Sequence, residues 1–376
     1  MVSKGKREQK IIIEEVVVVS GVIVAGIALQ LLTGSFDKAF LAFPVNVLLL
    51  IPLIALFFVR RASLKRVSSG SLSVILLIVV SLAALYMGLI PGNMVKISWP
   101  FVLIYLMIIV NLTAVISYRI KSFKGGDIPF ILNHAGLLIL LFSAGPGSAD
   151  KSRYFMRVNE GGTEWRGELS GSTNKDNIKE LPIAIYLEDF ILEEYPPKIA
   201  VVDRLTGETM PLGKEVYLES IKGASALFMD WRVTVDSFVN LPRYAPMTYI
   251  SVTNSIDNEV SKGWITCGNI FQNHKTYNLT EKYTIAMTFP EPKRFISRVE
   301  VYSQSGKTIT DSVMVNHPLT LGSWKIYQHS YNSQMGKDSD WSVFELVYDP
   351  WFIPALLGII LMLMGSVALI WNGGKR

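Results

Sequence analysis

The 376-residue sequence has only one cysteine and few charged residues. Cys267 has no partner for an internal disulfide, and no paired-cysteine metal site or redox motif can be formed. An oxidising compartment is therefore permitted but not indicated. Charged residues make up 18% of the chain, whereas an average soluble domain has about a quarter. Together with a hydrophobic content of 50%, this scarcity argues against an ordinary soluble protein.

Motifs that mark several enzyme classes are also missing. The sequence has no HExxH zinc-protease helix, no GxSxG nucleophile elbow and no CxxCH haem-attachment site. "SGKT" at residues 305–308 resembles the end of a phosphate-binding loop, but that motif needs a glycine where Val301 stands. A hairpin turn is the simpler interpretation. The sequence therefore does not predict an enzyme that acts alone.

Apolar residues are concentrated in the first 144 residues and at the C-terminal end. Six runs are long enough to cross the hydrocarbon core of a bilayer, which takes about 20 residues. They are approximately Val16–Leu32, Ala39–Val59, Leu72–Ile90, Trp99–Tyr118, Ile128–Ala144 and Trp351–Trp371. We therefore expect an α-helical membrane protein with about six transmembrane helices. Residues 1–144 would hold five of them, and residues 350–376 the last helix with a cytoplasmic tail.

Lysine and arginine residues indicate the orientation of these spans. They cluster before the first span, between the second and third, between the fourth and fifth, and after the last. Because such clusters stay in the cytoplasm, we expect both termini to be cytoplasmic and residues 145–349 to lie outside. The location would be the inner (plasma) membrane, with a periplasmic domain and lipid around the helices. Since the basic residues are topology signals, the net charge of +5 does not indicate nucleic acid as a partner.

The block over residues 145–349 is polar and has the patterns of β-strands. "LPIAIYLEDFILEEYPP" (181–197) is rich in branched and aromatic residues, and "RVEVYSQSGKTITDSVMV" (298–315) has a turn between two alternating runs. No helical pattern of about 10–15 residues separates the strands, so a parallel α/β sheet is not expected. A β-rich sandwich or open barrel, inserted before the last helix, is the expected architecture. Residues 147–177 are polar and glycine-rich, and we expect a long surface excursion there.

His134 lies inside the fifth predicted span, in "IPFILNHAGLLILLFSAG". It is six residues from the cytoplasmic end of that span, or about 9 Å along a helix. An ionisable residue is costly within a bilayer, so its presence points to a function. An imidazole can ligate haem iron through one ring nitrogen while the other donates a hydrogen bond. A hydrogen bond to Asn133 or Asn111 is the alternative reading.

The other three histidines have simple structural interpretations. "SVMVNHPLTLGSWKIYQHSY" (312–331) alternates as two strands around a reversal that contains proline and glycine. His317 lies beside that reversal and is a weak candidate for contacting a ligand. His329 lies in an aromatic row on one face of the second strand, and His274 is expected in an exposed loop.

The same residues carry a family resemblance. "VNHPL…GSWKIYQHSY", followed by "YDP" and a terminal apolar span, resembles the end of ResB/CcsB-type cytochrome c biogenesis proteins of system II. "LPIAIYLEDFILEEYPP" is similar to the strand that opens the extracytoplasmic domain of that family. "NHAGLLILL" is similar to the span that carries its intramembrane histidine. The resemblance covers three segments between residues 128 and 371.

This resemblance implies assembly of cytochrome c. A stand-alone ResB-like subunit pairs with a CcsA/ResC-type membrane protein. Together they export haem b and present it to the CxxCH thiols of apocytochrome c. His134 would be an axial haem ligand and would bind metal through the haem iron, whereas His317 in "VNHPL" would be structural or face a partner. The chain would be at most one subunit of a haem–apocytochrome ligation complex.

The sequence departs from that family in two respects. It has five predicted spans before the outer domain, whereas better-known stand-alone members have three, so the helices do not correspond one to one. It also has no tryptophan-rich "WGxxW"-like segment. A separate partner chain would therefore have to supply the outer haem platform.

Two other classes of protein stay open. The first is a membrane transporter or permease for another substrate, but such proteins usually have interrupted helices and paired repeats, and no repeat is visible here. The second is a membrane-anchored extracytoplasmic module that binds or senses a ligand. It would need no intramembrane histidine, but a sensor normally adds a cytoplasmic output segment. A neighbouring gene for a tryptophan-rich membrane protein would favour haem assembly over both.

Overall fold

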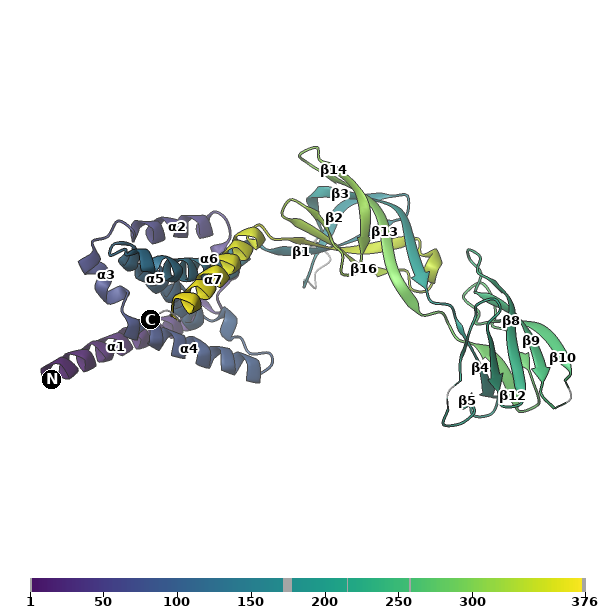
Figure 1. Cartoon of the computed structure of the whole chain (residues 1–376). Helices are drawn as coiled ribbons and strands as arrows, with labels where there is room; N and C mark the ends of the chain where they lie inside the picture. The colour runs from purple at the N-terminus through teal and green to yellow at the C-terminus, as the bar shows by residue number, and fades with distance from the viewer. Residues whose placement is uncertain (1, 172–177, 215, 257, 374–376) are drawn as a thin grey trace. The chain divides into compact units, whose positions relative to one another are not determined.

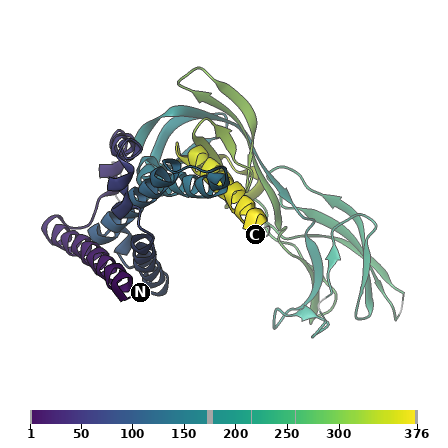
Figure 2. The same cartoon turned by 60° about the vertical axis from the view of Figure 1, so that its left-hand side comes forward.

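The computed structural model describes residues 2–171, 178–214, 216–256 and 258–373. The chain divides into two compact units. Met1–Ser152 and Tyr348–Arg376 form a helical unit, and Arg153–Val347 form a β unit (Figure 1). Both ends of the chain belong to the helical unit (Figure 2). This is the expected fold class, with the β-rich domain inserted before the last helix.

Apolar helices make up the helical unit. They are α1 (Val2–Thr33), α2 (Val45–Ala55), α3 (Arg61–Val67), α4 (Gly70–Leu89), α5 (Trp99–Ile120), α6 (Ile128–Ala144) and α7 (Phe352–Gly373). Within the described residues, five segments are long and apolar enough to cross a membrane. They are Gln9–Thr33, Arg61–Leu89, Trp99–Ile120, Gly125–Asp150 and Phe352–Trp371. Each overlaps one of the predicted spans.

The second predicted span, Ala39–Val59, has the shorter helix α2 as its one α-helix among the described residues, after the 3-10 helix η1 (Lys38–Leu41). The 11 residues of α2 are about 16 Å long, and Pro44 precedes it while Pro52 lies inside it. Asn46 donates to Asp150 Oδ2 at 2.7 Å, beyond the C-terminal end of α6. At the other end the Leu56 carbonyl accepts from Ser117 Oγ at 3.0 Å, near the C-terminal end of α5. The α2 segment therefore reaches between the two ends of the helical unit despite its length.

Helices α6 and α7 pack closely because glycines line their contact. A Cβ atom added to Gly136 would collide with the backbone of Gly358 and Met362, and one added to Gly358 would lie 2.8 Å from Gly136 O. Asn133 Nδ2 donates to Met362 O at 3.2 Å and to Ser366 Oγ at 2.7 Å. Small residues with hydrogen bonds between the helices are a typical way to join helices in lipid. This pairing fixes the helix that carries His134.

Asp150 forms hydrogen bonds at the point where the chain leaves and re-enters the helical unit. Its carboxylate accepts hydrogen bonds from Phe43 N at 2.7 Å, Asn46 Nδ2 at 2.7 Å and Trp351 Nε1 at 2.8 Å. The adjacent Lys151 forms an ion pair with Asp349 at 3.2 Å. The segments before the first strand and after the last strand are thus tied together.

The β unit contains an eight-stranded sheet that forms a nearly closed barrel. Its strands run in the order β14-β13-β3-β2-β1-β17-β16-β15. They are β1 (Ser152–Asn159), β2 (Thr163–Leu169), β3 (Ile178–Glu194), β13 (Pro292–Ser303), β14 (Thr308–Met314), β15 (Leu319–Leu321), β16 (Trp324–Tyr331) and β17 (Trp341–Tyr348). An antiparallel bridge between Met314 and His317 brings the two outer strands together.

Strands β1 and β2 show that the predicted surface excursion over residues 147–177 was wrong. Tyr154, Met156 and Val158 alternate into the barrel core and are at most 9% exposed. On the opposite face of β1, Arg153 pairs with Glu345 at 2.8 Å and Arg157 covers the Trp341 ring at 4.2 Å. These outward-facing basic residues hid the alternation in the sequence. Residues 172–177 lie outside the described residues.

A β-sandwich is inserted between β3 and β13 of the barrel (Figure 1). One sheet has the order β10-β9-β8-β7, and the other has the order β11-β12-β4-β5 with β6 on β4. Their bounds are β4 (Lys198–Asp203), β5 (Thr209–Met210), β6 (Leu218–Glu219), β7 (Ser225–Phe228), β8 (Trp231–Val239), β9 (Met247–Asn254), β10 (Val260–Thr266), β11 (Tyr277–Asn278) and β12 (Tyr283–Met287). Phe228, Ile250 and Ile285 lie at its centre with no exposed surface. The sequence predicted a sandwich or an open barrel, and both kinds of β-structure are present.

Candidate functional site

The His134 side chain packs against the preceding turn of α6. Its Nδ1 atom lies 2.9 Å from the Phe130 carbonyl oxygen. Its ring stacks on the Phe130 ring, with 3.7 Å between centroids. Because a carbonyl oxygen can only accept, Nδ1 carries the proton in this contact. The neutral ring therefore keeps its lone pair on Nε2.

His134 Nε2 has no hydrogen bond to any of the described residues, and the side chain is half-buried. The two asparagines in the alternative reading are engaged elsewhere. Asn133 bonds α7, while Asn111 Nδ2 donates to Val67 O at 2.6 Å and its Oδ1 accepts from Ser73 Oγ at 2.9 Å. The imidazole is thus oriented by its own helix and not by an interhelical hydrogen bond to either residue.

The Arg119 side chain lies at the N-terminal end of α6, about one helical turn from His134. The Arg119 guanidinium carbon is 5.0 Å from the centroid of the Phe130 ring. Its Nε pairs with Asp127 Oδ1 at 2.9 Å, and Asp127 Oδ2 accepts from the Lys124 backbone N–H at 2.9 Å. Phe130 therefore contacts both the imidazole and the guanidinium. The Arg119 side chain is 48% exposed.

The other predicted histidines lie in the β unit. The His317 backbone N–H donates to Met314 O at 3.0 Å and its carbonyl accepts from Met314 N at 3.3 Å, while its side chain is exposed. His329 is exposed on β16, with its ring centroid 4.7 Å from that of Phe155. His274 lies in an exposed loop. No three histidine, cysteine, aspartate or glutamate side chains among the described residues are grouped so that they could hold a metal ion.

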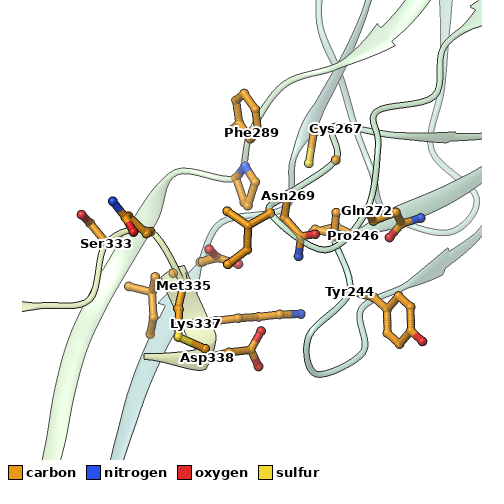
Figure 3. Close-up of a pocket in the computed structure, with 18 of the residues that line it drawn as sticks. Tyr244, Pro246, Cys267, Asn269, Gln272, Phe289, Ser333, Met335, Lys337 and Asp338 are labelled. Atoms are coloured by element: carbon orange, nitrogen blue, oxygen red, sulfur yellow. The ribbon is translucent and has the colours of Figure 1, made fainter. Parts of the chain in front are cut away.

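A cavity of about 610 Å³ opens in the β unit. It lies among the end of β3, the start of β13, the loops of the sandwich and the segment that follows β16. Figure 3 shows Cys267 and Phe289 on one side of it, and Met335, Lys337 and Asp338 on the other. Sequence reasoning missed this site. Its residues come from distant segments, and the only signal was that Cys267 is the single cysteine.

Burial sets the electrostatics of this cavity. The thiol of Cys267 is buried, and desolvation raises its pKa above the usual range. Desolvation also raises the pKa of the Glu194 carboxyl, and nearby Asp338 adds to this while Lys337 opposes it. The Lys337 ammonium donates to Leu241 O at 2.6 Å and to Asn240 Oδ1. Asp338 Oδ2 accepts from the Arg243 backbone N–H at 2.9 Å.

The fold defines an α-helical membrane protein that carries a barrel with an inserted sandwich. Residues 249–340 match the model of the ResB-like family. This match confirms the predicted resemblance and supports a ResB-type protein. The family suggests cytochrome c biogenesis in general and a membrane partner in that process. No curated protein matches the chain.

The matched segment runs from β9 to the short 3-10 helix η5 (Gly336–Asp338). It contains Cys267, His274, His317 and His329 but not His134. The haem-ligand role of His134 therefore stays a prediction.

Proposed function

We propose that this protein is the ResB-like subunit of a cytochrome c maturation complex. With a CcsA/ResC-type membrane protein, it would export haem b and present the haem and apocytochrome c for covalent attachment. The observation that carries this proposal is the orientation of His134, whose Nδ1 is held by Phe130 O while Nε2 stays free of hydrogen bonds within the described residues. The family match supplies the process.

The geometry of His134 suits an axial ligand of the haem cargo. Ligating histidines usually donate their second ring N–H to a carbonyl or carboxylate, which fixes the tautomer and makes the free nitrogen more basic. The Phe130 carbonyl accepts such a bond here. Stacking on Phe130 restricts rotation of the ring. Nε2 could then bind iron with little loss of side-chain entropy.

Arg119 could bind the propionates of haem. Its Nε is paired with Asp127, and its two terminal nitrogens, which form no hydrogen bond with the described residues, could donate to a further carboxylate. The Arg119 side chain lies over the Phe130 ring, near the N-terminal end of α6. The His134 ring stacks on the same phenylalanine. The macrocycle would lie between these two groups, with its propionates toward the cytoplasmic ends of the helices.

The chain would contribute binding and positioning, without any catalytic residue of its own. We infer that the β unit is periplasmic and holds apocytochrome c, while both termini are cytoplasmic and the helices lie in the inner membrane. The partner would complete the outer haem site.

Haem content tests the role of His134. The complex with the partner is expressed, purified and examined by absorption spectroscopy. We expect His134→Ala to reduce bound haem at least about tenfold, because the axial ligand is lost. Exposed His329→Ala is the matched control and should retain haem.

His134→Gly with added imidazole separates ligation from folding. Imidazole should restore haem and its Soret band, since the free base can occupy the space of the side chain. Unchanged haem content in His134→Ala would contradict the ligand role.

A further inference from the structure

Apolar side chains surround the cavity of the β unit. Tyr244, Ile270 and Phe289 line it and are 52%, 61% and 71% exposed. Single exposed hydrophobic residues are normal, but a group of them around a concave site usually marks binding. The cavity volume of about 610 Å³ lies within the range of ligand sites.

Two further exposed aromatic side chains are next in sequence to residues of the cavity lining. Tyr195 follows the lining residue Glu194, and Phe271 follows Ile270. These two side chains are 50% and 51% exposed. A small ligand would be buried in the cavity alone, whereas an extended chain can contact both the cavity and its flanks.

Carboxylates outnumber lysine in the cavity lining, because Glu194 and Asp338 are acidic and Lys337 is the lysine among the lining residues. Lys337 and Asp338 both bond the loop before β9, as described above. The half-buried Glu194 carboxylate forms no hydrogen bond within the described residues, and its charged neighbours are Lys337, which lowers its pKa, and Asp338, which raises it. A partly buried lining with two carboxylates and one ammonium favours a further cationic group and disfavours an anionic one. Haem, with its two propionates, is therefore a poor ligand for this site.

We propose that this cavity binds an extended segment of unfolded polypeptide in which a basic side chain stands beside apolar ones. The apolar side chains would contact Tyr244, Ile270 and Phe289, and the ammonium or guanidinium group would reach Glu194. The inference rests on the proposed function for the identity of the client, which would be apocytochrome c before its haem is attached.

Binding should depend on pH through Glu194. Since its pKa is raised by burial, the carboxylate takes up a proton at a higher pH than an ordinary glutamate, whose pKa is about 4.3. Only the ionised form attracts a cation, so binding should weaken as pH falls, beginning above that value. Asp338, Lys337, Cys267 and His274 are the other acidic, basic or thiol side chains that line the cavity, along with the phenols of Tyr244 and Tyr331.

Peptide binding to the full-length protein in detergent tests the proposal. The probe is a fluorescent peptide of alternating lysine and leucine, and its control replaces each lysine by glutamate. We expect fluorescence anisotropy to show binding of the lysine peptide and at least about tenfold weaker binding of the glutamate peptide. Equal affinity for the two peptides would overturn the proposal.

Two pairs of variants locate the binding site. Glu194→Gln should weaken binding of the lysine peptide about tenfold and remove its pH dependence. Glu208→Gln, on the exposed turn before β5, should leave it unchanged. Phe289→Ala should weaken binding, whereas Leu205→Ala, which removes a side chain 88% exposed elsewhere in the sandwich, should not. Wild-type affinity in both Glu194→Gln and Phe289→Ala would overturn the assignment to this cavity.

The same variants separate this inference from the proposed function. Glu194→Gln in complex with the partner should keep its haem, and His134→Ala should keep its peptide binding. No peptide binding beside normal haem loading would overturn the cavity assignment alone. Haemin that displaces the lysine peptide from wild type would also overturn it, because the site would then accept an anionic ligand.

Discussion

The helical unit and the β unit differ in the side chains that have no exposed surface. In the β unit the residues with no exposed surface are mostly apolar, such as Ile185 and Phe344. In the helical unit Asn46 and Ser117 have no exposed surface, whereas Leu82 is 62% exposed. Water drives apolar side chains inward, but lipid does not, and in lipid each polar group needs a partner inside the protein. The comparison shows that each unit is built for a different solvent.

The test with the largest expected effect replaces one leucine by alanine in each unit. We expect Leu346→Ala in the barrel core to lower the free energy of unfolding by about 3–5 kcal/mol, because Leu346 has no exposed surface and its loss leaves a cavity. Leu82→Ala on α4 should change stability by less than about 0.5 kcal/mol. Denaturant unfolding in detergent, followed by circular dichroism, measures both. Equal losses would mean that Leu82 contacts protein and not lipid.

Glycine substitutions sharpen the comparison within the helical unit. Gly136→Ala should destabilise it by about 1–3 kcal/mol, since the new Cβ would collide with the α7 backbone. Gly88→Ala on α4 meets no atom within 4 Å and should stabilise the helix by about 0.5–1 kcal/mol. Loss of helical signal during unfolding in detergent gives the two values. A neutral Gly136→Ala would show that α6 and α7 can separate without cost.

The smallest expected difference concerns buried hydroxyls. Ser297 Oγ lies 2.6 Å from Gln328 Oε1 and 2.9 Å from Ser342 Oγ in the barrel, and Ser297→Ala should cost about 1–2 kcal/mol. Ser73 Oγ donates to Asn111 Oδ1 at 2.9 Å, and Ser73→Ala should cost about 0.6 kcal/mol, the average for such bonds in membranes. The same unfolding measurements rank the two. A larger cost for Ser73→Ala than for Ser297→Ala would contradict the comparison, because the helical unit would then depend more on its polar contacts.

Predictions from the sequence succeeded where local pattern alone sets the structure. The predicted span Trp99–Tyr118 corresponds to α5, and the alternation in residues 324–331 corresponds to β16, with Trp324 and Ile326 buried. They failed where outward-facing charge hid a strand, as in β1. The span predicted over Ala39–Val59 was too long because prolines and a turn confine the helix to α2.

The candidate site at His134 could be anticipated only in part. Its depth in an apolar run was visible in the sequence, because hydropathy is additive along a helix. Its orientation was not, since the contacts with Phe130 and Arg119 depend on rotamers and on packing between α5 and α6. His317 was expected beside a turn, but the sequence did not show that its backbone forms an antiparallel bridge with Met314.

The sequence by itself determined the division into membrane helices and a β-rich domain, together with the place of an imidazole inside one helix. Hydrophobic length and alternation are local properties, so they can be read from neighbouring residues. Only the tertiary structure decided that Glu194, Cys267 and Lys337 share one cavity. Such a cavity forms where strands and loops far apart in the chain pack together, and no local pattern specifies which of them will meet.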